Sequence, residues 1–121
     1  MRTVLVPIEV CFMTRITFSF VTAALLAAGT AQAGPQTFDL TIKDHRFQPE
    51  AVTIPAREKV KLMVHNQDAT PEEFESYELN REKIIPGNSK AVIFVGPLEP
   101  GEYPFFGEFN QATAQGRVIA E

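Results

Sequence analysis

The sequence predicts an all-β fold, a Greek-key β-sandwich of about seven short strands, on three observations. Apolar and polar residues alternate with period two through residues 34–121, and the same stretch lacks helical periodicity. Turn-forming residues separate the apolar segments about every 8–12 residues, as they do in β-sandwiches. Nine prolines, without a segment of helix length rich in Ala, Leu and Glu, argue against helices.

Each predicted strand is an alternating or β-branched segment that ends at a turn. In residues 60–65, Val60, Leu62 and Val64 alternate with outward-facing residues, and residues 38–42 have the same pattern. In residues 72–79, the alternation predicts that Glu72 and Phe74 point inward and Glu73 outward. In chain order, the predicted strands are residues 38–42, 51–54, 60–65, 72–79, 91–95, 103–106 and 116–120.

Composition excludes several classes of protein. The chain has 121 residues and a net charge of −4, and it has no cluster of Lys and Arg to meet a phosphate backbone, so nucleic acid is not expected as a partner. One cysteine, Cys11, excludes a disulfide framework, a zinc ribbon and a CxxC redox pair. The sequence also lacks a Gly-rich phosphate loop, a GxSxG elbow and an HExxH motif, which argues against nucleotide-dependent and hydrolase chemistry.

Residues 1–33 are predicted to be a secretory signal. An apolar run from residue 16 ends in Ala31-Gln32-Ala33, follows Arg15 and contains no acidic residue, which is typical of a cleaved signal rather than an uncleaved anchor. Met13 is the expected true start. Cleavage would leave one domain, residues 34–121, in the periplasm, not membrane-spanning and without Cys11. Its charge would be 9 basic minus 14 acidic residues, or −5.

Four segments of residues 34–121 together resemble a cupredoxin. They are FDLTIKDHRFQPEAVTIPA, KLMVHNQDATPEEFES, PLEPGEYPFF and FNQATAQGRVIA. The resemblance implies a cupredoxin-like sandwich whose copper-ligand positions are here Glu72, Gly107, Asn110 and Ala114. A type 1 copper site uses two imidazoles, a thiolate and a weak axial ligand, so these four residues imply that no type 1 copper centre forms.

Two longer strings are similar to a narrower family. DATPEEFESYELNREKIIPGNSKAV and EYPFFGEFNQATAQG resemble the small periplasmic cupredoxin-like component of bacterial ferrous-iron uptake systems. This resemblance implies a role in handling or oxidising Fe(II), with an iron or copper ion as cofactor. It also implies a periplasmic iron-binding protein, an inner-membrane iron permease and a membrane ferredoxin-like protein as companions.

A metal site is predicted where the loops of the sandwich meet at one end. We expect His45, Glu72, Glu108 and Asn110 to converge there on one cation. Carboxylates with one imidazole suit Fe(II), Mn(II), Zn(II) or Cu(II) and suit Cu(I) poorly, and anionic oxygen donors favour Fe(III), which is the physical link to a ferroxidase step. The weaker ligand candidates are Glu73, Glu75, His65 and Met63.

Three of these residues have an alternative role without metal. Glu72 could form a salt bridge with Arg46 or Arg81. Glu73 and Glu75, with Glu78, could be a solvated acidic face that docks a basic partner. The sequence therefore predicts a periplasmic accessory protein that binds Fe(II) or Cu(II) and assists iron oxidation or hand-over. The alternative is a metal-free interaction module that docks on transporter partners.

Overall fold

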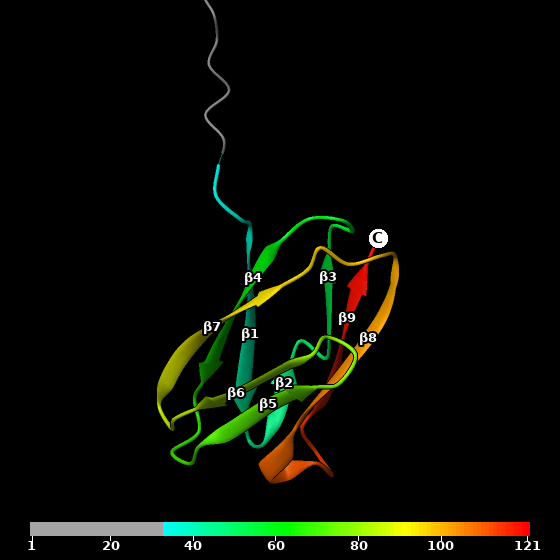
Figure 1. Ribbon diagram of the computed structural model, residues 1–121. Coiled ribbons are helices and arrows are strands. Elements are labelled where there is room, and N and C mark those ends of the chain that lie inside the picture. The colour runs from blue at the N-terminus through cyan, green and yellow to red at the C-terminus, as the bar shows by residue number, and fades with distance from the viewer. Residues whose placement is uncertain (1–32) are drawn as a thin grey trace, which may run out of the picture. The chain divides into compact units, whose positions relative to one another are not determined.

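The computed structural model describes residues 33–121, which form two β-sheets packed face to face (Figure 1). Residues 1–32 of the predicted signal, with Cys11 and Met13, lie outside these residues. In the described part, no helix is long and apolar enough to cross a membrane. The elements are β1 (Thr37–Lys43), β2 (Arg46–Gln48), β3 (Ala51–Ile54), β4 (Val60–Asn66), β5 (Glu72–Ser76), β6 (Arg81–Ile85), β7 (Ser89–Val95), β8 (Gly101–Gly107), the 3-10 turn η1 (Glu108–Asn110) and β9 (Gln115–Ala120).

The all-β sandwich is confirmed, with nine strands in residues 33–121 rather than about seven. The two additional strands are β2, which has three residues, and β6, whose sequence REKII does not alternate. Both are edge strands that form as hairpin partners of β1 and β5. The predicted strand 72–79 ends at Ser76, because the Ser76 hydroxyl accepts a hydrogen bond from the Leu79 N–H and turns the chain.

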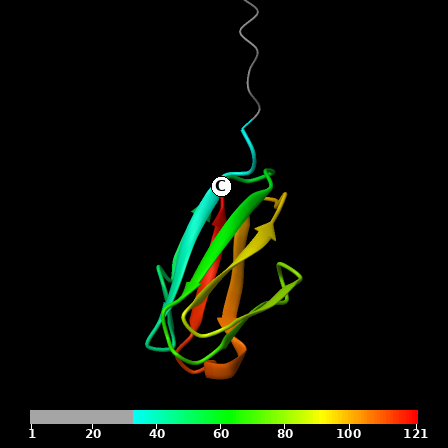
Figure 2. The ribbon, with the colours of Figure 1, turned by 90° about the vertical axis from the view of Figure 1, so that its left-hand side faces the viewer.

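The sheets have the strand orders β2-β1-β4-β7 and β3-β9-β8-β5-β6. Two strand pairs, β1 with β4 and β3 with β9, are parallel, and the others are antiparallel. In Figure 2, β1, β4 and β7 of the four-stranded sheet face the viewer in cyan, green and yellow, and the five-stranded sheet lies behind them.

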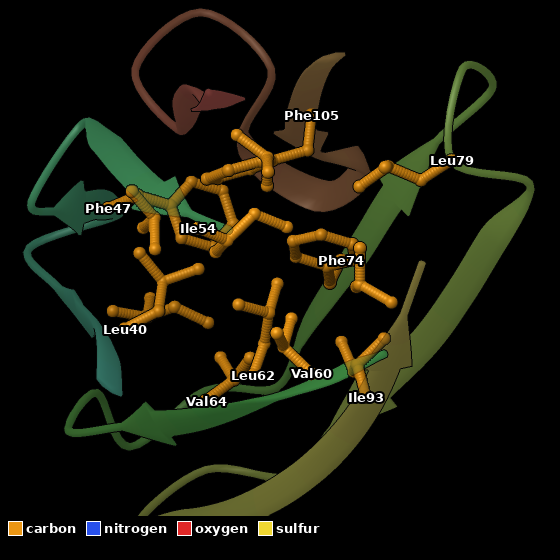
Figure 3. Close-up of a cluster of buried hydrophobic side chains, with 14 of the residues drawn as sticks. Leu40, Phe47, Ile54, Val60, Leu62, Val64, Phe74, Leu79, Ile93 and Phe105 are labelled. Carbon is orange, nitrogen blue, oxygen red and sulfur yellow. The ribbon is translucent and has the colours of Figure 1, made fainter. Parts of the chain in front are cut away.

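The core fills the space between the sheets (Figure 3). At its centre, the Phe47 ring meets Phe105 edge-on with centroids 4.9 Å apart, and Phe74 packs against both rings. Leu40 and Leu62 of the four-stranded sheet are also fully buried. The strands and the core of the described residues lie within residues 37–120, so residues 34–121 contain all of them.

Four connections meet at one end of the sandwich, which we call the loop end. They join β1 to β2, β4 to β5, β6 to β7 and β8 to β9. Hydrogen bonds link them: the Asn88 N–H donates to the Asp68 carbonyl, and the Thr113 hydroxyl donates to the His45 carbonyl. The fold thus places loops from both sheets side by side, as the sequence predicts.

Candidate functional site

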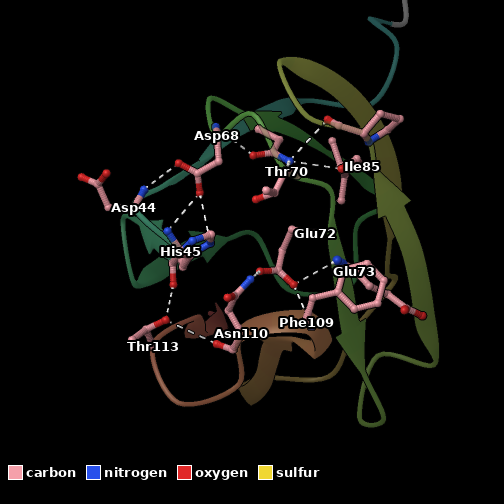
Figure 4. Close-up of polar contacts among 12 residues, drawn as sticks. Asp44, His45, Asp68, Thr70, Glu72, Glu73, Ile85, Phe109, Asn110 and Thr113 are labelled. Atoms are coloured by element: carbon pink, nitrogen blue, oxygen red, sulfur yellow. Dashed lines mark hydrogen bonds and ion pairs between the residues drawn. The ribbon is translucent and has the colours of Figure 1, made fainter.

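The carboxylate of Glu72 lies at the centre of the loop end and is only 1% exposed (Figure 4). Its Oε1 accepts hydrogen bonds from the backbone N–H groups of Glu73 (3.1 Å) and Phe109 (2.9 Å). Its Oε2 accepts a hydrogen bond of 2.7 Å from the Asn110 side-chain amide. Glu72 points inward from β5, as predicted. The hydrogen bonds that its carboxylate accepts from Phe109 and Asn110 connect β5 to η1.

Two small residues make room for this carboxylate. A Cβ added to Gly107 would lie 2.6 Å from Glu72 Cδ and 2.7 Å from Ala114 Cβ, both far inside normal contact distance. The Ala114 carbonyl accepts a hydrogen bond of 2.8 Å from the Gly107 N–H. The four positions that the resemblance assigns to copper ligands, Glu72, Gly107, Asn110 and Ala114, therefore lie together, and the Glu72 carboxylate occupies the space between them.

His45 lies in a neighbouring network centred on Asp68 (Figure 4). Asp68 accepts hydrogen bonds from the backbone N–H groups of Asp44 (2.8 Å) and His45 (3.0 Å), both of which have positive φ. The His45 backbone N–H is the main cause that lowers the pKa of Asp68. The His45 ring nitrogen Nδ1 lies 3.6 Å from Asp68 Oδ2, so the imidazole pairs with this carboxylate.

Of the four main predicted ligands, Glu72 and Asn110 are hydrogen-bonded to each other. His45 pairs instead with Asp68, which is not a predicted ligand. The Glu108 carboxylate accepts a hydrogen bond from the Gln111 side chain. Within residues 33–121, no three side chains of His, Cys, Asp or Glu are placed to hold one metal ion. The convergence of His45, Glu72 and Glu108 on a common point is therefore not seen, and a metal-binding role for these residues stays a prediction.

The salt bridge predicted as the metal-free role of Glu72 is wrong. Among the ion pairs of the described residues, none joins Glu72 to an arginine. Arg81 instead donates a hydrogen bond to the Phe94 carbonyl. Backbone N–H groups and an amide stabilise the buried carboxylate in place of a guanidinium.

Four carboxylates lie close together beside the loop end, on the outer face of β5 and β6 and on η1. We call the surface formed by Glu73, Glu75, Glu82 and Glu108 the acidic face. A hydrogen bond with Glu82 is the main cause that raises the pKa of Glu73. Partial burial and the charge of Glu108 raise the pKa of Glu75. None of these four carboxylates has a lysine or arginine partner among the ion pairs of residues 33–121.

Aromatic side chains adjoin the acidic face. Tyr77 is 72% exposed, and its ring packs against Phe106 with centroids 5.7 Å apart. Phe106 is the strand partner of Glu75, so this aromatic pair continues directly from the carboxylates. The charge of Glu75 is the main cause that raises the pKa of Tyr77. Phe109 of η1, which follows Glu108 in the chain, is also exposed.

The weaker candidates lie on two different faces. Glu73 and Glu75 belong to the acidic face. His65 and Met63 of β4 lie on the outer side of the other sheet, where His65 Nε2 is 3.0 Å from Asp39 Oδ1. The structure therefore separates these two pairs.

Sequence reasoning missed Asp68 and Glu82 as members of these networks. Asp68 follows Asn66, whose side-chain oxygen accepts a hydrogen bond from the Asp68 N–H, and this Asn-x-Asp turn was the available signal. Glu82 carries no such signal, because it faces Glu75 through the pairing of β5 with an edge strand that the sequence did not predict.

Comparison with protein families gives one match to most of the chain. The family model described as a cupredoxin-like domain matches residues 15–120. Among curated proteins, the chain is 50% identical over 80 residues to the uncharacterized protein RP394 of Rickettsia prowazekii, a match that covers 66% of this chain. The match covers 64% of that relative, so the chain spans less than two thirds of its length.

Solved structures show the same fold at low sequence identity. Auracyanin A, a "blue" copper protein from Chloroflexus aurantiacus, matches with a TM-score of 0.63 and 13% identity over 73% of this chain and 100% of its own. The metal-binding domain of the Streptococcus pneumoniae Cu(I)-exporting ATPase CopA matches with a TM-score of 0.65 and 16% identity, over 73% of this chain and 87% of its own. Amicyanin from Paracoccus versutus matches with a TM-score of 0.57 and 18% identity, over 75% of this chain and 87% of its own.

Proposed function

The chain belongs to the cupredoxin-like domain family, and on this basis we propose that it is a periplasmic accessory protein of a bacterial ferrous-iron uptake system. It works by docking on its transport partners and not as a blue-copper electron carrier. The periplasmic iron-binding protein and the inner-membrane iron permease are the proposed partners. The similarity of residues 68–92 and 102–116 to the uptake component supports this assignment.

The observation that carries the proposal is the buried Glu72 carboxylate, hydrogen-bonded to Phe109 and Asn110 at the loop end. A type 1 copper ion requires imidazole and thiolate donors, and the residues at the four ligand positions supply neither. Residues 34–121 contain no cysteine. The donors therefore do not fit such an ion, and no electron-transfer step is assigned to this end of the molecule.

The acidic face is the proposed docking surface. A hydrogen bond with Glu82 is the main cause that raises the pKa of Glu73, and partial burial is the main cause for Glu75. Repulsion from neighbouring carboxylates raises both pKa values further, and a basic partner would relieve that repulsion. Tyr77 and Phe109 supply exposed aromatic area at its edges, and aromatic residues are enriched where proteins meet. Carboxylates without a lysine or arginine partner in residues 33–121, together with exposed aromatic rings, favour a partner surface that carries cations and apolar groups.

Docking is tested by measuring how tightly residues 34–121 bind the purified periplasmic iron-binding protein and the solubilised permease of the same uptake system. The double variant Glu75→Gln/Glu82→Gln is expected to weaken binding about tenfold, mainly through a slower association rate, and high salt should do the same. The matched control, Glu58→Gln/Glu99→Gln, removes the same charge from exposed sites elsewhere. Equal effects of the two double variants, or no binding to either partner, would overturn the proposal.

A second candidate function is the binding of Fe(II) or Cu(II) by the acidic face. It is favoured by one observation: partial burial, the charge of Glu108 and a proton shared in a hydrogen bond with Glu108 all raise the pKa of Glu75. A divalent cation could replace that proton, because carboxylate oxygens are suitable donors for Fe(II) and Cu(II).

Anaerobic titration of residues 34–121 with Fe(II) and with Cu(II) tests this candidate. It predicts saturable binding that Glu75→Gln/Glu108→Gln abolishes and Glu58→Gln/Glu99→Gln preserves. Loss of binding in Glu72→Ala alone would instead place the ion at the loop end. Absence of saturable binding near stoichiometric metal would rule out a metal site both at the acidic face and at the loop end. Docking would then remain as the proposed function.

A further inference from the structure

The outer side of the four-stranded sheet is a second surface, opposite the acidic face (Figure 2). Alternation along β1, β4 and β7 turns one set of side chains into the core and the other outward. The strand register then fixes the outward neighbours, with Lys61 beside Phe94, Met63 beside Val92 and His65 beside Lys90. We call the surface formed by these outward residues the basic face.

An apolar strip runs along β7 of the basic face. Phe94 is 43% exposed and Val92 is 37% exposed, with Met63 half-buried beside them. Two ammonium groups flank the Phe94 ring: Lys59 Nζ lies 4.8 Å and Lys61 Nζ 5.7 Å from its centroid. The aromatic ring therefore has lysines beside it that hold positive charge at the level of the protein surface.

Cations outnumber acidic groups on this face. Of the outward residues on β1, β2, β4 and β7, Asp39 is the acidic one, and His65 already contacts it at 3.0 Å. One exposed acidic residue, Asp44, directly flanks these strands. The exposed or half-buried cationic side chains on or directly flanking these strands are Lys43, Arg46, Lys59, Lys61 and Lys90. The surface is thus positive although residues 34–121 have a net charge of −5, from 9 basic and 14 acidic residues.

We propose that the basic face docks on the surface of an anionic phospholipid membrane. An ammonium group is a compact charge suited to a lipid phosphate, and each juxtamembrane lysine strengthens such binding about fivefold. Phe94 and Val92 can enter the boundary between head groups and acyl chains, while Lys59 and Lys61 stay at the level of the phosphates. The face matches the two layers of a bilayer surface, one charged and one apolar.

The type of cation favours lipid over an acidic protein. Interfaces between proteins are enriched in Arg and depleted in Lys, whereas this face carries lysines around its apolar strip. Repulsion between the acidic face and the membrane is weak, because packed sheets are about 10 Å apart and charges are screened over about 8 Å at physiological ionic strength. Membrane docking by one face would leave the acidic face free for a protein partner, so this inference goes beyond the proposed function and does not depend on it.

Vesicle co-sedimentation tests the proposal with residues 34–121. We expect binding to vesicles of phosphatidylglycerol and phosphatidylcholine in equal parts, and not to vesicles of phosphatidylcholine alone. Lys61→Gln should weaken binding about fivefold, and the triple variant Lys59→Gln/Lys61→Gln/Lys90→Gln about a hundredfold. Arg117→Gln removes one cation from the other sheet and is the matched control for Lys61→Gln. Phe94→Ala should also weaken vesicle binding, and circular dichroism checks that each variant is folded.

Three results would overturn the proposal. The first is equal binding to anionic and neutral vesicles, or to neither. The second is an equal loss of affinity in Arg117→Gln and Lys61→Gln. The third is binding of soluble poly-glutamate that Phe94→Ala leaves unchanged, together with failure to bind anionic vesicles, which would assign the face to an acidic protein. None of these results involves the acidic face, so they leave the docking proposal to its own test.

Discussion

Replacing Glu72 with alanine is expected to lower the free energy of unfolding of residues 34–121 by about 2–4 kcal/mol. The substitution deletes the acceptor for three hydrogen bonds, from the N–H groups of Glu73 and Phe109 and the amide of Asn110. It also leaves a space in a buried position, because Glu72 is 1% exposed. Urea unfolding monitored by circular dichroism measures the change.

Glu73→Ala is the matched control for this prediction. The neighbouring carboxylate faces outward and lies against Glu82, so its removal should change stability by less than about 0.5 kcal/mol. Glu72→Gln, which keeps one acceptor oxygen, should fall between the two variants. A cost in Glu72→Ala no larger than that in Glu73→Ala would mean that the buried carboxylate does not hold the loop end together.

The fold could be predicted from the sequence because period-two alternation is a local signal. Leu40, Leu62, Val64 and Phe74 occupy the inward positions that the alternation assigns to them, and all four are buried. The edge strands escaped prediction because their pairing is decided by their neighbours. The REKII sequence of β6 is exposed on four of its five residues, so it has no buried face to produce alternation.

The sequence predicts which loops meet at the loop end, but it does not predict the hydrogen bonds that form there. The inward direction of Glu72 follows from β5, and its proximity to Asn110 follows from the fold. The sequence does not indicate that η1 turns the Phe109 N–H toward Glu72, or that the Asp44–His45 turn directs its N–H groups to Asp68. These hydrogen bonds depend on backbone conformation in loops, where residue type constrains geometry weakly. The hydrogen bond from Phe109 also satisfies the Glu72 carboxylate, one of the predicted metal ligands.

Gly107→Ala is expected to destabilise the domain by about 1–3 kcal/mol through overpacking alone. The backbone of Gly107 has φ −94°, which alanine adopts without strain, so the cost comes from the added Cβ. That Cβ would lie 2.6 Å from Glu72 Cδ, and Glu72 cannot move away without breaking its hydrogen bonds to η1. Gly34→Ala, with nothing within 4 Å of the new Cβ, is the matched control and should leave stability unchanged.

A double-mutant cycle then tests whether Gly107 and Glu72 occupy one shared space. In the Glu72→Ala background, Gly107→Ala should cost at least about 0.5 kcal/mol less than in the wild type, because the Cβ gains the volume that the carboxylate vacates. Part of the cost should persist, since Ala114 Cβ remains 2.7 Å away, and adding Ala114→Gly should remove it. If the three substitutions are additive in urea unfolding, the carboxylate does not fill the position between Gly107 and Ala114. The absence of a side chain at Gly107 would then need another cause.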